Sequence, residues 1–250
     1  MNDLVQSIRE KYSFTLEKIA AAANHAGRDP KSVKLVVVTK AQPVEVARAA
    51  IEAGARYLGE NYPEEGVAKI QLLREFSAVE WHMIGHVQSR KAQSVAGNFN
   101  FLHSLDSLKL AARLDRFCGE AGRSLPVLLE FNVGAEESKS GWPASDESRW
   151  PELLDELSAV AALPHLQVRG LMTMPPLGSD PEFSRPYFQR LRRLQEFLAS
   201  QISPADGSVN FDELSMGTSS DYEVAVQEGA TLVRVGTAIV GPRQYKTESL

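Results

Sequence analysis

Leu35-Val36-Val37-Val38-Thr39-Lys40 is the stretch around which we expect the fold to be organised. A short apolar run of β-branched residues predicts a buried strand, and this one ends on a lysine. Side chains alternate along a strand, so Val36, Val38 and Lys40 are expected on one face. If that face lines a closed interior, a partly desolvated amine lies at the mouth of a core and can attack an aldehyde. The alternative is that the strand simply ends and Lys40 reaches into solvent.

Apolar strands and amphipathic helices alternate along the rest of the chain. Further strands are predicted at residues 56–58, 81–84, 100–103, 127–132, 166–172, 211–214 and 231–235. Helical periodicity separates them, and one extra helix over residues 2–27 precedes the first strand. About eight such units predict a single α/β (β/α)8 TIM-type barrel, although an open doubly wound sheet has the same alternation. No linker or change of composition marks a boundary, so we predict one domain spanning residues 1–250.

The composition is that of an ordinary globular protein, with 43% hydrophobic and 24% charged residues. The 27 basic and 32 acidic side chains give a net charge of −5 without any basic block, which argues against nucleic acid as a partner. No apolar run could span a membrane, and the N-terminus lacks a signal-peptide pattern. Cys118 is the only cysteine, which excludes an intrachain disulfide and a thiolate metal cluster. We expect a cytoplasmic monomer.

Small hydroxyl residues and glycines gather where the last two predicted strands end. The segment Ser215-Met216-Gly217-Thr218-Ser219-Ser220-Asp221 precedes a helix, and Gly236-Thr237 follows the final strand. In (β/α)8 barrels phosphate often binds after strands seven and eight, where backbone N–H groups and hydroxyls can contact an anion. Either segment alone is explained by an ordinary helix cap or strand end. The two together favour a phosphate site.

Two polar residues lie at or near predicted strand ends. Arg234 lies on the strand face opposite Val233 and Val235. If the valines face the outer helices, the guanidinium points inward, where it needs either a structural ion pair or a ligand. Asn61 can contact a ligand or cap the helix that begins at Pro63.

His82 and His86 raise the question of a metal site. The sequence has no His-Glu-x-x-His helix and no nearby carboxylate at ligand spacing, so we predict core or rim histidines and no metal. Asn132 and Met174, near two other strand ends, are either ligand contacts or structural residues. Glycine fingerprints for a nucleophile elbow, a P-loop or a dinucleotide are absent.

Seven short motifs occur in order over nearly the whole chain. They are VVTK at 37–40, GENY at 59–62, WHMIGHVQS at 81–89, ESKSG at 137–141, RGLMT at 169–173, LSMG at 214–217 and VRVGT at 233–237. On these motifs the chain resembles the pyridoxal 5′-phosphate (PLP) homeostasis proteins, a PLP-binding family with the alanine racemase N-terminal barrel fold. It departs from the family pattern at Thr218, where methionine is usual, and at Arg90, where asparagine is usual.

The resemblance implies roles for individual residues. Lys40 would form a Schiff base with the PLP aldehyde, Asn61 would lie near the ring, and Arg234 would face the pyridine nitrogen. The phosphate would be surrounded by Ser215, Ser219, Gly236 and Thr237. The predicted set of cofactor-binding residues also includes His82, Met174 and Gly217.

An arginine beside the pyridine nitrogen would weaken the cofactor as a catalyst. A guanidinium is a permanent cation, so the nitrogen would stay unprotonated and the ring would be a poorer electron sink. The racemases that share this barrel carry a second, β-rich domain and a partner tyrosine, whereas this chain ends soon after its last predicted strand. We therefore expect a protein of vitamin B6 homeostasis that holds PLP with little or no turnover, with PLP-dependent apoenzymes as candidate recipients.

Two other functions use the same lysine. One is a PLP-dependent amino acid racemase or related enzyme. The other is a cofactor-free barrel aldolase in which Lys40 captures a carbonyl substrate.

Overall fold

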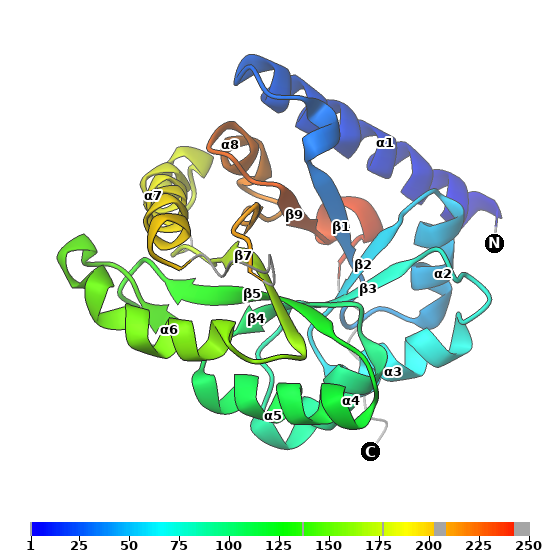
Figure 1. Cartoon of the computed structure of the whole chain (residues 1–250). Helices are drawn as coiled ribbons and strands as arrows, with labels where there is room; N and C mark the ends of the chain where they lie inside the picture. The colour runs from blue at the N-terminus through cyan, green and yellow to red at the C-terminus, as the bar shows by residue number, and fades with distance from the viewer. Residues whose placement is uncertain (1, 137, 177, 203–208, 243–250) are drawn as a thin grey trace.

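Eight parallel strands form a closed barrel in the computed structural model (Figure 1). The structure describes residues 2–136, 138–176, 178–202 and 209–242. The strands are β1 (Lys34–Val38), β2 (Tyr57–Glu60), β3 (Glu80–Met83), β4 (Phe101–Leu105), β5 (Leu125–Asn132), β7 (Leu166–Met172), β8 (Glu213–Ser215) and β9 (Leu232–Val235). Their order is β4-β3-β2-β1-β9-β8-β7-β5, and β4 also pairs with β5. That last pairing closes the ring and confirms the barrel over the open sheet.

Helices surround the barrel on its outside (Figure 1). They are α1 (Asn2–His25), α2 (Val44–Glu52), α3 (Pro63–Leu72), α4 (Ala92–Asn98), α5 (Leu108–Glu120), α6 (Leu154–Ala161), α7 (Arg185–Gln201), α8 (Tyr222–Gln227) and α9 (Thr237–Val240). The extra N-terminal helix, α1, packs against α2, α8 and α9, which adjoin β1 and β9 in the chain. None of the helices in the described residues is both long and apolar enough to cross a membrane.

The structure differs from the predicted elements mainly in short segments. The two-residue strand β6 (Trp142–Pro143) and the four-residue helix α9 were not predicted, because neither is long enough to show a period. The helix predicted at 151–162 begins as a 3-10 segment, Glu147–Leu153, since Pro151 has no N–H to donate. Strand β1 ends at Val38, so Lys40 lies on the turn that follows it.

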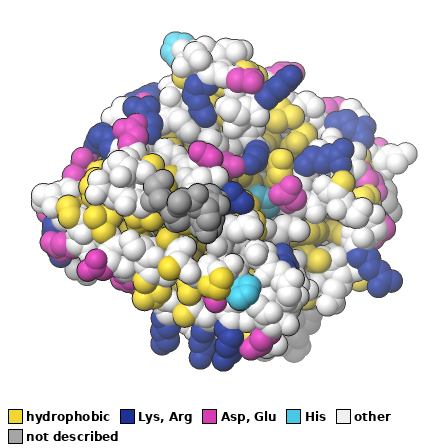
Figure 2. Space-filling model, viewed as in Figure 1, with side chains coloured by type: hydrophobic (Ala, Val, Ile, Leu, Met, Phe, Trp, Pro, Cys, Tyr) yellow, Lys and Arg dark blue, Asp and Glu magenta, His cyan; other side chains and the backbone are white. Residues whose placement is uncertain are grey.

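Alternation along β1 divides the apolar side chains into two clusters. Val36 faces the barrel interior, whereas Leu35 and Val37 belong to the larger cluster between the strands and the helices. The inner cluster consists of Val36, Phe101, Leu128, Met172 and Leu232. These side chains fill part of the barrel interior, as expected for a barrel of eight strands. Over the face shown in Figure 2, acidic and basic side chains are interspersed.

Candidate functional site

A cavity of about 660 Å³ lies at the carboxyl ends of the strands. Residues from the ends of seven strands, or from the loops that follow them, line it. Among the predicted cofactor-binding residues, the lining contains Lys40, Asn61, Met174, Ser219, Arg234, Gly236 and Thr237. This end of a (β/α)8 barrel is where its active sites are found.

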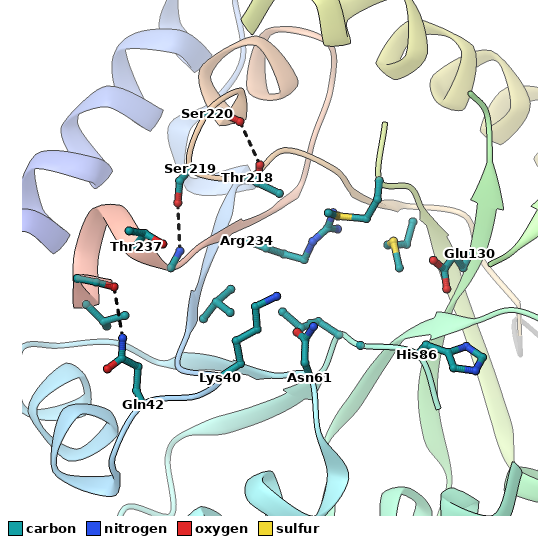
Figure 3. Close-up of a pocket in the computed structure, with 18 residues that line it drawn as sticks. Lys40, Gln42, Asn61, His86, Glu130, Thr218, Ser219, Ser220, Arg234 and Thr237 are labelled. Carbon is teal, nitrogen blue, oxygen red and sulfur yellow. Dashed lines mark hydrogen bonds between the residues drawn. The ribbon is translucent and has the colours of Figure 1, made fainter. Parts of the chain in front are cut away.

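Lys40 projects into this cavity from the turn after β1. Figure 3 shows its side chain beside Asn61 and below Arg234, with the amine directed into the cavity. The next residue, Ala41, has a φ of 54°, a left-handed conformation that is uncommon for a residue with a side chain. Such a turn must be held by its surroundings.

A buried cluster of charged groups lies behind that turn. Lys69 on α3 is 4% exposed. Its Nζ donates to the carbonyl oxygen of Thr39 at 2.7 Å, to Oε1 of Glu60 at 2.8 Å and to Oε1 of Glu65 at 2.6 Å. The Thr39 hydroxyl donates to the same Glu60 oxygen at 2.6 Å. Burial raises the pKa of Glu60, and the Lys69 cation opposes this shift. The cluster fixes the backbone one residue before Lys40.

Arg234 points into the barrel, and its neighbours on β9 face outward. Val233 and Val235 belong to the outer cluster, while Arg234 is 4% exposed and borders the cavity. One guanidinium nitrogen donates to the Ser215 hydroxyl; the other donates to the Thr173 carbonyl at 2.9 Å. In the described part of the chain these partners are neutral, so the structural ion pair considered above is not found. Burial lowers the pKa of Arg234 to about 10, which leaves it charged at neutral pH.

Hydroxyl groups collect at one end of the cavity. Figure 3 shows Ser219, Ser220 and Thr237 on the same side of the opening. The backbone N–H of Gly236 donates to the Ser219 hydroxyl at 3.3 Å, and the hydroxyls of Thr218 and Ser220 lie 3.4 Å apart. Hydroxyls and a backbone N–H on neighbouring loops form a donor set suited to an anion.

Glu130 and His86 lie at the other end of the cavity (Figure 3). Burial raises the pKa of Glu130 to about 7, and its Oε2 has no hydrogen-bond partner in the described residues. His86 Nδ1 lies 2.8 Å from Asp106 Oδ2. Neither Glu130 nor His86 was predicted to bind the cofactor. Glu130 could have been identified from the sequence as a candidate site residue, because it is the only carboxylate within the apolar run at 127–132.

Three predicted cofactor-binding residues, His82, Ser215 and Gly217, do not line the cavity. Gly217 has a φ of 92°, and a Cβ there would lie 2.5 Å from the Cβ of Ala225, so its place in the structure is explained by backbone shape and packing. Ser215 lies beneath Arg234 and is fully buried.

His82 is a core histidine. It is 1% exposed, stacks on the ring of Phe101 at 5.2 Å, and its Nδ1 lies 2.8 Å from Nε2 of His103. The sequence pattern did not single out His103, which ends the strand predicted at 100–103. In the structure it lies within β4, beside a second buried polar residue, Ser104. The described residues contain no cluster of three or more side chains suited to a metal ion.

The chain is similar to known proteins over nearly its whole length. The family described as alanine racemase, N-terminal domain, matches residues 16–244. The pyridoxal phosphate homeostasis protein of Escherichia coli (strain K12) is 37% identical over 248 residues, which cover 98% of this chain and 99% of that protein. The protein of the same name from Aquifex aeolicus is 39% identical and covers 94% and 98% of the two chains. The chain belongs to the pyridoxal phosphate homeostasis protein family.

Solved structures extend this family assignment to the fold. PipY of Synechococcus elongatus, solved with PLP bound, is 37% identical and superposes with a TM-score of 0.75 over 89% of this chain and 100% of PipY. An alanine racemase from Clostridium difficile is 16% identical, with a TM-score of 0.65 over 94% of this chain and 61% of the racemase. At that identity the racemase shows the fold alone.

The two departures from the family pattern lie in different surroundings. Thr218 borders the cavity, and both its N–H and its hydroxyl donate to Asp221, at 2.7 and 3.1 Å. The threonine therefore helps to close the turn that carries Ser219. Arg90 does not line the cavity; its Nε donates to Gln88 at 3.0 Å.

Proposed function

We propose that this chain binds PLP reversibly through Lys40 and acts in PLP homeostasis, with little or no turnover of its own. The proposal rests on the cavity, because an amine, a guanidinium and a group of hydroxyls surround the same space. We further propose that the chain works as a single-domain monomer in the cytoplasm and supplies PLP to apoenzymes. The family membership and the PLP-bound structure of PipY support the choice of cofactor.

The residues present fit the chemical groups of PLP. When bound, PLP supplies an aldehyde that condenses reversibly with a primary amine, with loss of water. Lys40 provides the amine, and the hydroxyls of Ser219 and Thr237 provide donors for the phosphate. The N–H of Gly236 lies beside them and donates to Ser219 in this structure. Asn61 has a buried Oδ1 without a hydrogen-bond partner in the described residues, which is available to a ligand donor. The volume of about 660 Å³ is in the range of small-molecule sites.

Arg234 is the reason for proposing storage over catalysis. Its guanidinium has donors only and stays charged, so it can donate to the pyridine nitrogen but cannot accept a proton from it. A pyridine held unprotonated withdraws fewer electrons from an attached amino acid. The cavity therefore favours holding the cofactor over forming carbanions on it.

Covalent labelling tests the proposal directly. After incubation with PLP, borohydride reduction and peptide mass analysis should place a phosphopyridoxyl group on Lys40. The label should be lost in Lys40→Ala and kept in Lys91→Ala, whose amine pairs with Glu64 on the surface. A label on another lysine would overturn the site. Sustained, Lys40-dependent proton exchange at the Cα of amino acids would favour the racemase instead.

A further inference from the structure

A line of polar side chains crosses the barrel interior beneath the cavity. Arg234 on β9 donates to the hydroxyl of Ser215 on β8. That hydroxyl lies 2.8 Å from Nδ1 of His103 on β4, and Nε2 of His103 lies 2.8 Å from Nδ1 of His82 on β3. Nε2 of His82 lies 3.7 Å from a carboxylate oxygen of Glu80, also on β3. The line therefore joins opposite sides of the barrel.

The two ends of this line have different access to solvent. Arg234 borders the cavity, and Ser215, His103 and His82 are at most 1% exposed. Glu80 begins β3, and its side chain is 51% exposed. Because the strands are parallel, the start of β3 lies at the end of the barrel opposite the cavity. Four buried groups thus form a line from the cavity floor toward the Glu80 carboxylate. At 3.7 Å the final contact is longer than a hydrogen bond, and Nε2 of His82 has no hydrogen-bond partner in the described residues.

The chemistry of its two ends gives the line a direction. A guanidinium has donors only, so the Ser215 hydroxyl accepts from Arg234 and can donate its own hydrogen bond to an unprotonated Nδ1 of His103. His103 then carries its proton on Nε2 and donates to Nδ1 of His82. His82 in turn carries its proton on Nε2, which faces the Glu80 carboxylate.

The reverse arrangement is disfavoured at both ends. It would direct a lone pair of His82 at the Glu80 carboxylate and would leave the Ser215 proton in need of another acceptor. Burial lowers the pKa of both His82 and His103, which favours the neutral form of each ring. A neutral ring carries one proton, which is the number that this order of hydrogen bonds needs at each histidine.

We propose that His103 and His82 are positioning residues for Arg234. Through Ser215 they hold its guanidinium in the place from which it would contact the PLP ring, and this part of the inference rests on the proposed function. Loss of His103 leaves the Ser215 hydroxyl free to turn away, so that one guanidinium nitrogen loses its acceptor while the other keeps the Thr173 carbonyl.

Nitrogen NMR of the cofactor-free protein tests the direction of the line without PLP. At neutral pH, His82 and His103 should both be neutral with the proton on Nε2. The three other histidines of the chain provide internal references. A proton on Nδ1 of His103, or a charged ring at either position, would overturn the proposal.

A pair of substitutions at His103 tests the positioning role. His103→Leu removes the acceptor of the Ser215 proton, whereas His103→Asn retains an acceptor near the former Nδ1. With His103→Leu we expect PLP affinity to fall about tenfold, the cost of one hydrogen bond to a charged group, and the absorbance maximum of bound PLP to shift. His103→Asn should restore most of both. Ser215→Ala should reproduce the effects of His103→Leu. If His103→Leu does not fold, Ser215→Ala tests the same link to Arg234.

Leu128→Ala is the matched control, because it disturbs the same inner cluster without touching the polar line. It should lower stability and leave the absorbance maximum unchanged. If the wild type is labelled at Lys40 but His103→Leu and Ser215→Ala keep the wild-type affinity and spectrum, the positioning role is wrong and the proposed function stands. If the wild type does not take up PLP, the proposed function fails, and the NMR experiment still decides the direction of the line.

Discussion

At the scale of single residues, the buried amine of Lys69 is expected to contribute strongly to stability, because it bonds to three acceptors behind the Lys40 turn. Lys69→Met would leave Glu60 and Glu65 without their shared cation, next to a backbone carbonyl that also loses its donor. Breaking a buried ion pair costs about 3–5 kcal/mol, so we expect that loss in the free energy of unfolding measured with urea. Lys91→Met, which removes an exposed pair with Glu64, should cost less than about 1 kcal/mol. Equal losses would show that the Lys69 cluster does not hold the turn.

Glu130 predicts a pH dependence of stability in the cofactor-free protein. Its folded-state pKa is raised by burial from 4.5 to about 7, so the folded protein binds more protons than the unfolded chain between these values. Stability of the wild type should therefore fall, relative to Glu130→Gln, as the pH rises from about 4.5 to about 7. Above that range the variant should be more stable by an amount on the order of 3 kcal/mol. A difference that does not change with pH would contradict this origin.

The sequence pattern predicted which side chains lie near the ends of the strands. Alternation placed Arg234 opposite its two valines, and the run before Lys40 placed the lysine near a core. His103 was not singled out, because it and Ser104 are adjacent polar residues in a five-residue strand, which is too short for a periodic signal. The partner of His103, Ser215, is 112 residues away in the chain, and only closure of the barrel brings the two together.

At the scale of elements, the loop after β8 and the start of α9 supply the hydroxyl end of the cavity. Ser219→Ala combined with Thr237→Ala removes two donors from it, so PLP binding should weaken by at least about tenfold. Pyridoxal, which lacks the phosphate, should lose little affinity, as measured by absorbance titration. Ser200→Ala, an exposed position on α7, is the control. Equal losses for both ligands would mean that the phosphate lies elsewhere.

Elements bounded by clear turn residues were predictable, whereas the shortest segments were not. The strand expected at 166–172 and the helix at 222–227 have the observed limits, since apolar runs flanked by turn residues define them. By contrast α9 holds Thr237 in place but is four residues long, too short for any helical period. The cavity is built largely from such short segments, so its shape could not be predicted from periodicity.

At the scale of the whole molecule, α1 is part of the barrel's support, although it precedes the first strand. It packs against α2, α8 and α9, beside the pairing of β1 with β9 that brings Lys40 and Arg234 to one cavity. Ile8, on the inner side of α1, is 2% exposed and belongs to the main apolar cluster, whereas Leu4 on the same helix is 37% exposed.

Ile8→Ala should therefore lower the free energy of unfolding by about 2–5 kcal/mol, because it leaves a cavity between α1 and the barrel. Leu4→Ala should change it by less than about 1 kcal/mol, since little buried surface is lost. Urea unfolding followed by fluorescence and by circular dichroism measures both, and the two probes should coincide if α1 unfolds together with the barrel. If Ile8→Ala melts α1 in a separate, earlier transition, the helix is a peripheral addition and the barrel closes without it.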